Sequence, residues 1–464
     1  MAFTRLARVA ALCCVQFVDV LGVTVVVTAL PTMLRDLSVP TSASSLVVTA
    51  YAMFFGGLLM FGARIGDRFG HRRTVVGSLL AYAVASLLTG SASWIGFLIA
   101  GRCLQGAAAA GTVPSALRLL SSADLDNEQR QRALAAWSAT GAVAGASGFV
   151  VGGLVTQVAS WRLIFWTIAP LALFLALAIW RMAPAGGNKS GKPLDVAGAA
   201  LLTAAVMALV VGSSFVQRPP SCVLGAILIC VGILILVTLL RLEKVAPDPL
   251  LPATVWRDWN LRTGLLGAFL NTATTSSAMT IATLYLQDGR GLSAAAAGLL
   301  LMPFSVLVVG GSIVSAPLLR RRPSGQVAAL GLGVIAFGNL TLFLVPALSW
   351  MLPACVAFAG LGIGMSSVAA TNLALDVPEV LRGTAAGLVN TAAQIGTALG
   401  VAIFLLIASA AGGAATAIGA RLGWAGTALL ALGGAIKFSL TSTSRLTSEP
   451  SPPSQLPSHG KYVK

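Results

Sequence analysis

One acidic side chain lies deep inside an apolar stretch of this sequence. Residues 9–31 read VAALCCVQFVDVLGVTVVVTALP, a run long enough to cross a lipid bilayer, and Asp19 stands near its middle. The other acidic residues fall in loops or at the ends of apolar runs. A charged side chain at the centre of a membrane helix costs about 2.5–3.5 kcal/mol, and such residues mark ion or substrate pathways. The position of Asp19 therefore predicts a functional site.

A buried basic residue is predicted in the stretch LIAGRCLQGAAAAG, residues 98–111. Arg102 and Gln105 are three residues apart and so share one helix face. Gly106 and the following alanines permit close helix packing, which explains the small residues but not a buried arginine. At about 1.5 Å per residue, Asp19 and Arg102 fall at similar depths, which permits contact between them. Arg102 would then favour ionised Asp19 while burial opposes it, an arrangement suited to carrying a proton.

Polar side chains also occur within later apolar runs. The stretch NTATTSSAMT places Asn271 and Thr275 on one helix face, and Asn390 and Gln394 likewise lie four residues apart. Two interpretations of the first stretch stay open: its hydroxyl groups bond to carbonyl groups of their own helix, or they form a polar wall. We predict a substrate cavity lined by Gln105, Asn271, Thr275, Asn390 and Gln394.

The loop between the second and third apolar runs reads GARIGDRFGHRR. Gly70 permits a tight turn, and four neighbouring charges form a cluster at the membrane face: Asp67, Arg68, Arg72 and Arg73. Such a cluster can pair with neighbouring helix ends and hold one face of the protein shut. The alternative is a turn whose charges only set topology. We expect His71 to be a solvated loop histidine.

The composition is that of an integral membrane protein. Of the 464 residues, 57% are hydrophobic and only 9% are charged, whereas soluble domains carry roughly 25% charged residues. The net charge of +16 would suit a nucleic-acid partner, but the basic residues lie in short loops and are better explained as topology determinants. The six cysteines lie inside apolar runs and the chain has two histidines. We therefore expect no nucleic-acid binding, no metal site, no catalytic residues and no cofactor.

Continuous apolar runs of about 20 residues predict transmembrane helices rather than a β-barrel. Fourteen runs occur, near 9–30, 45–63, 74–92, 95–117, 134–157, 162–182, 195–215, 222–241, 262–286, 294–316, 326–346, 350–372, 384–411 and 423–441. With the N-terminus in the cytoplasm, most of the 30 lysines and arginines fall in cytoplasmic segments, so we expect both termini inside. The runs divide into six-helix bundles at 1–183 and 261–442, with two linker helices and a loop in 184–260 and a disordered tail at 443–464.

Two of these motifs resemble signatures of the major facilitator superfamily. The charged loop is similar to motif A, Gly-x-Leu-x-Asp-Arg-x-Gly-Arg-Arg. Asp67, Arg68, Gly70 and Arg72 match it, and Ala63, Ile65 and His71 differ. The stretch beginning at Arg102 matches motif B, Arg-x-x-Gln-Gly-x-x-x-Ala, in full. The resemblance implies that motif A gates transport and that Arg102 lines the pathway and assists proton transfer.

A third stretch, GFVVGG, resembles motif C, Gly-Pro-x-x-Gly-Gly, which is associated with antiporters in that family. Phe149 stands where the proline belongs. We expect Gly148, Gly152 and Gly153, like Gly106, to serve as helix-packing or hinge positions. Close packing of helices alone is the simpler explanation of these glycines.

The first apolar run departs from the family's fourteen-span drug:proton antiporters, which read Leu-Asp-x-Thr-Val-Val-Asn-Val-Ala-Leu-Pro. Gly22 occupies the aspartate position and Val27 the asparagine position. Asp19 lies three residues before Gly22, on roughly the same helix face. We predict that Asp19 replaces the family's acid as a displaced proton site.

The resemblance implies an all-α polytopic membrane protein with the major facilitator fold, of the bacterial antibiotic and multidrug efflux type. It implies a monomer in the cytoplasmic membrane that exports a small amphipathic compound in exchange for protons, driven by the proton gradient. Asp19 and Arg102 would couple the protons. Uptake by a symporter or facilitator stays open as an alternative. A membrane-embedded enzyme or a receptor is disfavoured, because no nucleophile–base pair and no signalling domain can be identified.

Overall fold

The computed structural model describes residues 2–40, 44–121, 127–183, 196–216, 221–242, 258–344, 351–377 and 379–446. The described residues form 14 α-helices and one π-helical turn. The elements are α1 (Ala2–Asp36), α2 (Ser44–Phe69), α3 (His71–Gly90), α4 (Ile95–Ser121), α5 (Asn127–Val158), α6 (Trp161–Met182), α7 (Val196–Val216), α8 (Cys222–Leu242), α10 (Trp259–Leu284), η2 (Tyr285–Gly289), α11 (Ala294–Leu319), α12 (Ser324–Leu344), α13 (Leu352–Leu375), α14 (Glu379–Ala410) and α15 (Ala417–Leu446). Each helix coincides with one predicted apolar run, so the prediction of an all-helical protein is confirmed.

Eleven helical segments among the described residues are long and apolar enough to cross a membrane. The helices α4 and α10 are not among them, and both carry polar side chains within their apolar sequence: Arg102 and Gln105 in α4, and the stretch 271–280 in α10. In α7 the apolar stretch is Ala200–Leu209. Crossing by all fourteen helices and the side of the membrane on which the termini lie stay predictions.

Local sequence sets several of the helix starts. Asp258, Ser160 and Ser293 each accept a hydrogen bond from a backbone N–H in the first turn of α10, α6 and α11, respectively. These N-caps satisfy donors that the first helical turn leaves without partners. Between α2 and α3, Gly70 adopts a φ of 96°, a left-handed conformation that favours glycine.

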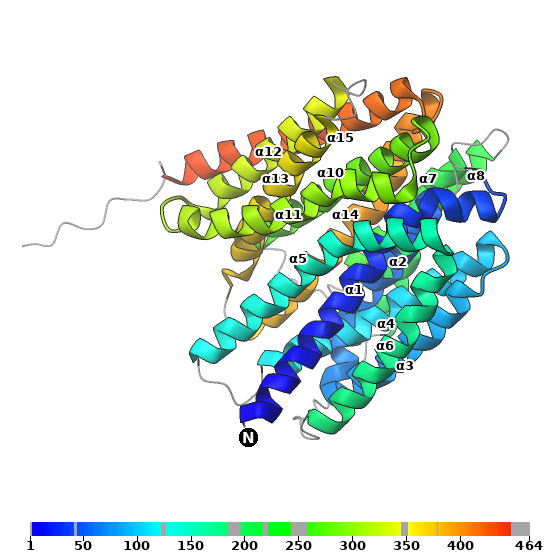
Figure 1. Ribbon diagram of the computed structural model, residues 1–464. Helices are drawn as coiled ribbons and strands as arrows, with labels where there is room; N and C mark the ends of the chain where they lie inside the picture. The colour runs from blue at the N-terminus through cyan, green and yellow to red at the C-terminus, as the bar shows by residue number, and fades with distance from the viewer. Residues whose placement is uncertain are drawn as a thin grey trace, which may run out of the picture.

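The helices gather into two bundles, with the helices α1–α6, coloured from blue to blue-green, in one and the helices α10–α15, coloured from green to red, in the other (Figure 1). Within the first bundle α4 packs against α2 and α3, and α1 packs against α5. The helices α7 and α8 pack against each other, and α7 also contacts α2 and α14. The bundles meet where α5 packs on α11 and α2 packs on α14.

The predicted domain boundaries stay predictions. The helix α15 continues to Leu446, beyond the predicted end of the second bundle at 442. The rest of the predicted tail and most of the proline-containing loop in 184–260 lie outside the described residues.

Candidate functional site

The side chain of Asp19 lies inside the first bundle, on α1. It is 9% exposed, and the buried hydroxyl group of Tyr51 on α2 donates a hydrogen bond to its Oδ1 atom. A carboxylate in an apolar interior is stabilised by such charge-assisted hydrogen bonds. Tyr51 is fully buried, so this contact is shielded from solvent.

Arg102 reaches the same region from α4 and is 1% exposed. Its Nη1 atom donates to the carbonyl oxygen of Gly22 at 3.1 Å and to Oε1 of Gln105 at 3.0 Å. The centre of its guanidinium group lies 4.7 Å from the centroid of the Tyr51 ring, a cation–π contact. Within the described part of the chain, no ion pair joins Arg102 to Asp19. Tyr51 contacts both groups and therefore links them.

The polar network continues from Gln105 to α3. Gln105 donates from Nε2 to Oγ of Ser86 at 2.9 Å, and Ser86 donates to the carbonyl oxygen of Tyr82 at 2.7 Å. Side chains from α1, α2, α3 and α4 thus form one buried network around a single carboxylate. Gln105 belongs to this network through its hydrogen bonds to Arg102 and Ser86.

The Tyr82 side chain explains why residue 22 is a glycine. A Cβ atom at Gly22 would lie 2.4 Å from the Tyr82 hydroxyl oxygen, so this hydroxyl fills the space of a side chain. The hydroxyl group is buried and has no hydrogen-bond partner. Beside it lies a cavity of about 10 Å³, lined by Asp19, Tyr82 and five further residues of α1, α3 and α4. That volume is close to the space that one water molecule needs.

The glycines of the predicted packing motifs set the distances between these helices. A Cβ atom at Gly106 would stand 2.3 Å from the carbonyl oxygen of Tyr51, so α4 touches the α2 backbone at the residue that contacts Asp19. Gly148 and Gly152 also lie close to α1, where an added Cβ atom would meet the side-chain hydroxyl groups of Thr24 and Thr28 first. The helices are thus closely packed at these glycines, and the role of the glycines as packing or hinge positions stays a prediction.

Gly153, the last glycine of the motif C stretch, makes a contact between the two bundles. A Cβ atom there would lie 2.3 Å from the carbonyl oxygen of Ala294 on α11. Gly298 of α11 approaches the carbonyl oxygen of Phe149 as closely. Small residues on both helices thus allow α5 and α11 to pack backbone to backbone.

The motif A cluster forms contacts within the first bundle. Nε2 of His71 lies 3.2 Å from Oδ1 of Asp67, and the His71 side chain is 19% exposed. The expectation of a solvated histidine is therefore wrong; the turn at Gly70 folds α3 back so that His71 faces α2. Arg72 donates to the carbonyl oxygen of Trp180 and stacks 4.5 Å from its ring centroid, which ties α3 to the end of α6. Arg68 lies 5.7 Å from the ring centroid of its neighbour Phe69.

Most hydroxyl groups in residues 271–280 bond to their own helix. Thr275 donates to the carbonyl oxygen of Asn271 at 2.6 Å, and Thr274, Ser277 and Thr280 make equivalent bonds. Asn271 is 1% exposed and accepts a hydrogen bond of 2.5 Å from Ser366 on α13, while its Nδ2 atom has no partner. The interpretation of bonding within the helix thus describes this stretch better than a polar wall.

The two predicted cavity residues of α14 differ in their surroundings. The side chain of Asn390 is exposed. Gln394 packs against α2: a Cβ atom added at Gly56 would lie 2.6 Å from the Cβ atom of Gln394. No hydrogen bond among the described residues joins Gln105, Asn271, Asn390 and Gln394 into one site.

Sequence reasoning missed the two tyrosines that contact or border Asp19. The chain has only four tyrosines, and Tyr51 and Tyr82 stand inside the second and third apolar runs. A tyrosine in the apolar interior needs a partner for its hydroxyl group. That requirement could have identified both residues as candidates.

Three comparisons with known proteins give the context for this arrangement. The sequence profile of the Major Facilitator Superfamily matches residues 12–401. The chain is 34% identical over 416 residues to the puromycin resistance protein of Streptomyces alboniger, covering 85% of this chain and 80% of that protein. It is 33% identical over 412 residues to a cephamycin export protein of Amycolatopsis lactamdurans, covering 85% and 83%.

One solved structure resembles this chain along nearly its whole length. It is a bacterial homologue of the human lysosomal transporter Spinster in an inward-facing and unoccupied conformation, with a TM-score of 0.71 at 16% identity. The match covers 97% of this chain and 99% of that one. At this identity the likeness establishes the fold.

Proposed function

Because this chain belongs to the major facilitator superfamily and is related to antibiotic export and resistance proteins, we propose that it exports a small amphipathic compound in exchange for protons. It is a transporter rather than an enzyme. The relatives are named for export of or resistance to antibiotics, which supports export over uptake.

The hydrogen bond from Tyr51 to Asp19 is the observation that carries the proposal of proton coupling. Asp19 is the proton acceptor. The Tyr51 hydroxyl stabilises its ionised form, and Arg102 acts through the Tyr51 ring. In alternating access, Asp19 takes a proton when the site faces outward and releases it when the site faces the cytoplasm. The cavity beside Tyr82 is large enough for about one water molecule, which would carry that proton.

Motif A and the predicted cavity take the remaining roles in this proposal. The cytoplasmic face is gated by Asp67, Arg68, Gly70 and Arg72. The contact between Asp67 and His71 is broken when this gate opens. Gln105, Asn271, Thr275, Asn390 and Gln394 line the substrate path. The glycines of α5 act as the hinge where that helix meets α1 and α11.

The proposed topology follows the distribution of basic residues. All fourteen helices cross the cytoplasmic membrane of a bacterium with both termini inside, and the protein works as a monomer. Residues 1–183 and 261–442 form the two moving halves, joined by the linker helices of 184–260. A small-molecule substrate, protons and the surrounding lipid are its partners.

Proton flux in vesicles tests this function. A resistance screen in a bacterial strain that lacks its own pumps first identifies an exported compound, with puromycin as the starting probe. Adding that compound to vesicles that hold the full chain should dissipate an imposed pH gradient. Asp19→Asn should remove at least about 90% of the flux, because the amide cannot carry the proton. The exposed Asp376→Asn is the matched control and should keep it.

Two results would contradict the proposal. Unchanged flux in Asp19→Asn would remove this residue as the proton site. Cells that accumulate the compound, instead of losing it, would establish uptake by a symporter or facilitator.

A further inference from the structure

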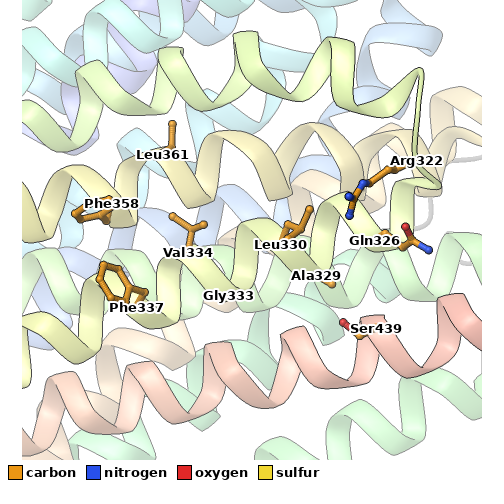
Figure 2. A pocket seen from close by; sticks show the side chains of 10 residues that line it. All are labelled: Arg322, Gln326, Ala329, Leu330, Gly333, Val334, Phe337, Phe358, Leu361 and Ser439. Carbon is orange, nitrogen blue, oxygen red and sulfur yellow. The ribbon is translucent and has the colours of Figure 1, made fainter.

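A groove lies in the second bundle, remote from the Asp19 network. It has a volume of about 580 Å³ and runs between α12, α13 and α15. Figure 2 shows Arg322 and Gln326 at one end and the rings of Phe337 and Phe358 at the other. Ser439 of α15 borders the polar part. One end of the groove is therefore polar and basic, and the other is apolar.

The apolar part of the groove opens to the outside of the bundle. Phe337 and Phe358 are 51% and 43% exposed, and Leu330 between the two ends is 41% exposed. The two phenylalanine rings meet edge to face, with centroids 5.2 Å apart. In a membrane these side chains face lipid, so an occupant enters this groove from the bilayer.

The length of the groove matches one leaflet. Gln326 and Phe337 are eleven residues apart on α12, which corresponds to about 16 Å at 1.5 Å per residue. Half of a hydrocarbon core of about 30 Å is about 15 Å. The groove thus extends from the membrane surface to about the middle of the bilayer.

The polar end carries positive charge that forms no ion pair within the described part of the chain. Arg320, Arg321 and Arg322 lie together between α11 and α12, and the ion pairs found among the described residues involve none of them. A cluster of arginines at the membrane surface attracts anionic headgroups. Arginine also binds phosphate oxygens with paired N–H groups.

We propose that this groove binds an anionic phospholipid of the adjacent leaflet. The phosphate group lies against Arg322 and Gln326, and an acyl chain follows the apolar lining to Phe337 and Phe358. Gly333 forms part of the floor: a Cβ atom there would meet no other atom within 4 Å. The absence of a side chain at Gly333 leaves the space that the acyl chain occupies.

Two substitutions test the two halves of the site. The full chain is reconstituted in phosphatidylethanolamine vesicles containing phosphatidylglycerol, and retained lipid is counted by native mass spectrometry. Arg322→Gln should lower phosphatidylglycerol retention about fivefold, the equivalent of about 1 kcal/mol for one basic residue near anionic lipid. Gly333→Leu should lower it by at least as much, because the side chain fills the groove without a clash.

Matched variants keep this test specific. Arg421→Gln removes an exposed arginine that lies on α15, away from the groove lining. Gly77→Leu adds a side chain at a glycine of α3 that also faces open space. Both variants should retain the lipid like the wild type. Wild-type retention in Arg322→Gln and Gly333→Leu would refute the site. Equal retention of phosphatidylethanolamine would refute the preference for an anionic headgroup. Equal loss of phosphatidylglycerol in the two control variants would refute the location of the site.

Discussion

A single methyl group on Gly106 should disturb the proton site without changing any polar residue. The Cβ atom of Gly106→Ala would stand 2.3 Å from the carbonyl oxygen of Tyr51 and 3.1 Å from the backbone nitrogen of Phe55. Both contacts are made with backbone atoms, which cannot rotate away as a side chain does. The helices α2 and α4 must therefore separate.

The size of that separation follows from the contact distances. Ordinary van der Waals contact begins near 3.4 Å, so the α2 backbone must retreat by about 1 Å at Tyr51. Such overpacking costs about 1–3 kcal/mol. A displacement of about 1 Å in a positioned group can reduce its activity by about 100-fold. We expect proton flux to fall at least tenfold as the Tyr51 hydroxyl moves from Asp19.

Proton flux in vesicles and thermal unfolding of the purified chain measure the two effects. Gly77→Ala is the control, because a Cβ atom there meets no other atom within 4 Å. It should behave as the wild type in both assays. If Gly106→Ala transported protons as fast as Gly77→Ala with unchanged stability, close packing of α4 on α2 would not position the site.

Three further experiments test the hydroxyl group of Tyr51, the contact between Gly22 and Tyr82, and the ion pair of Arg162. Tyr51→Phe keeps the ring that faces Arg102 but removes the hydrogen bond to Asp19. A hydrogen bond to a charged group contributes about 1.5–3 kcal/mol, so proton flux in vesicles should fall at least about tenfold. Wild-type flux would exclude the hydroxyl group from proton coupling. Gly22→Ala should lower the free energy of unfolding by about 1–3 kcal/mol. Adding Tyr82→Phe should restore most of that loss, because the nearest ring atom then lies 3.7 Å from the new methyl group. If this double-mutant cycle shows no rescue, the strain lies elsewhere. Arg162→Gln breaks the 2.5 Å ion pair with Asp36. It should lower the free energy of unfolding by less than about 1 kcal/mol in the same assay, because both groups are partly exposed. A larger loss would mean that the pair stabilises the ends of α1, α3 and α6 more than an exposed pair does.

Much of the fold could be predicted because each membrane helix is encoded locally. A continuous apolar run both forms the helix and excludes other spanning structures, since backbone groups in lipid must bond within their own segment. The same reasoning identified Asp19 and Arg102, because a charge within such a run is costly wherever the helix packs. Small residues at Gly106 and Gly152 also predicted close packing before the partner helices were known.

The partners of these residues could not be predicted in this way. Helices such as α1 are apolar around most of their circumference, so periodicity does not reveal which face meets which neighbour. Only the packing of α2 on α4 brings Tyr51 between Asp19 and Arg102. Whether Asn271 faced a cavity or another helix depended likewise on the position of Ser366 on α13.

The sequence by itself determined that one carboxylate would be buried in the membrane, but the tertiary structure decided its surroundings. The glycine at position 22 is explained by Tyr82, whose hydroxyl oxygen occupies the space that a side chain there would need. This contact joins α1 and α3, which are not consecutive in the sequence. Such a relation depends on the rotation of each helix about its axis and on the distance between helices, which no local pattern of residues specifies.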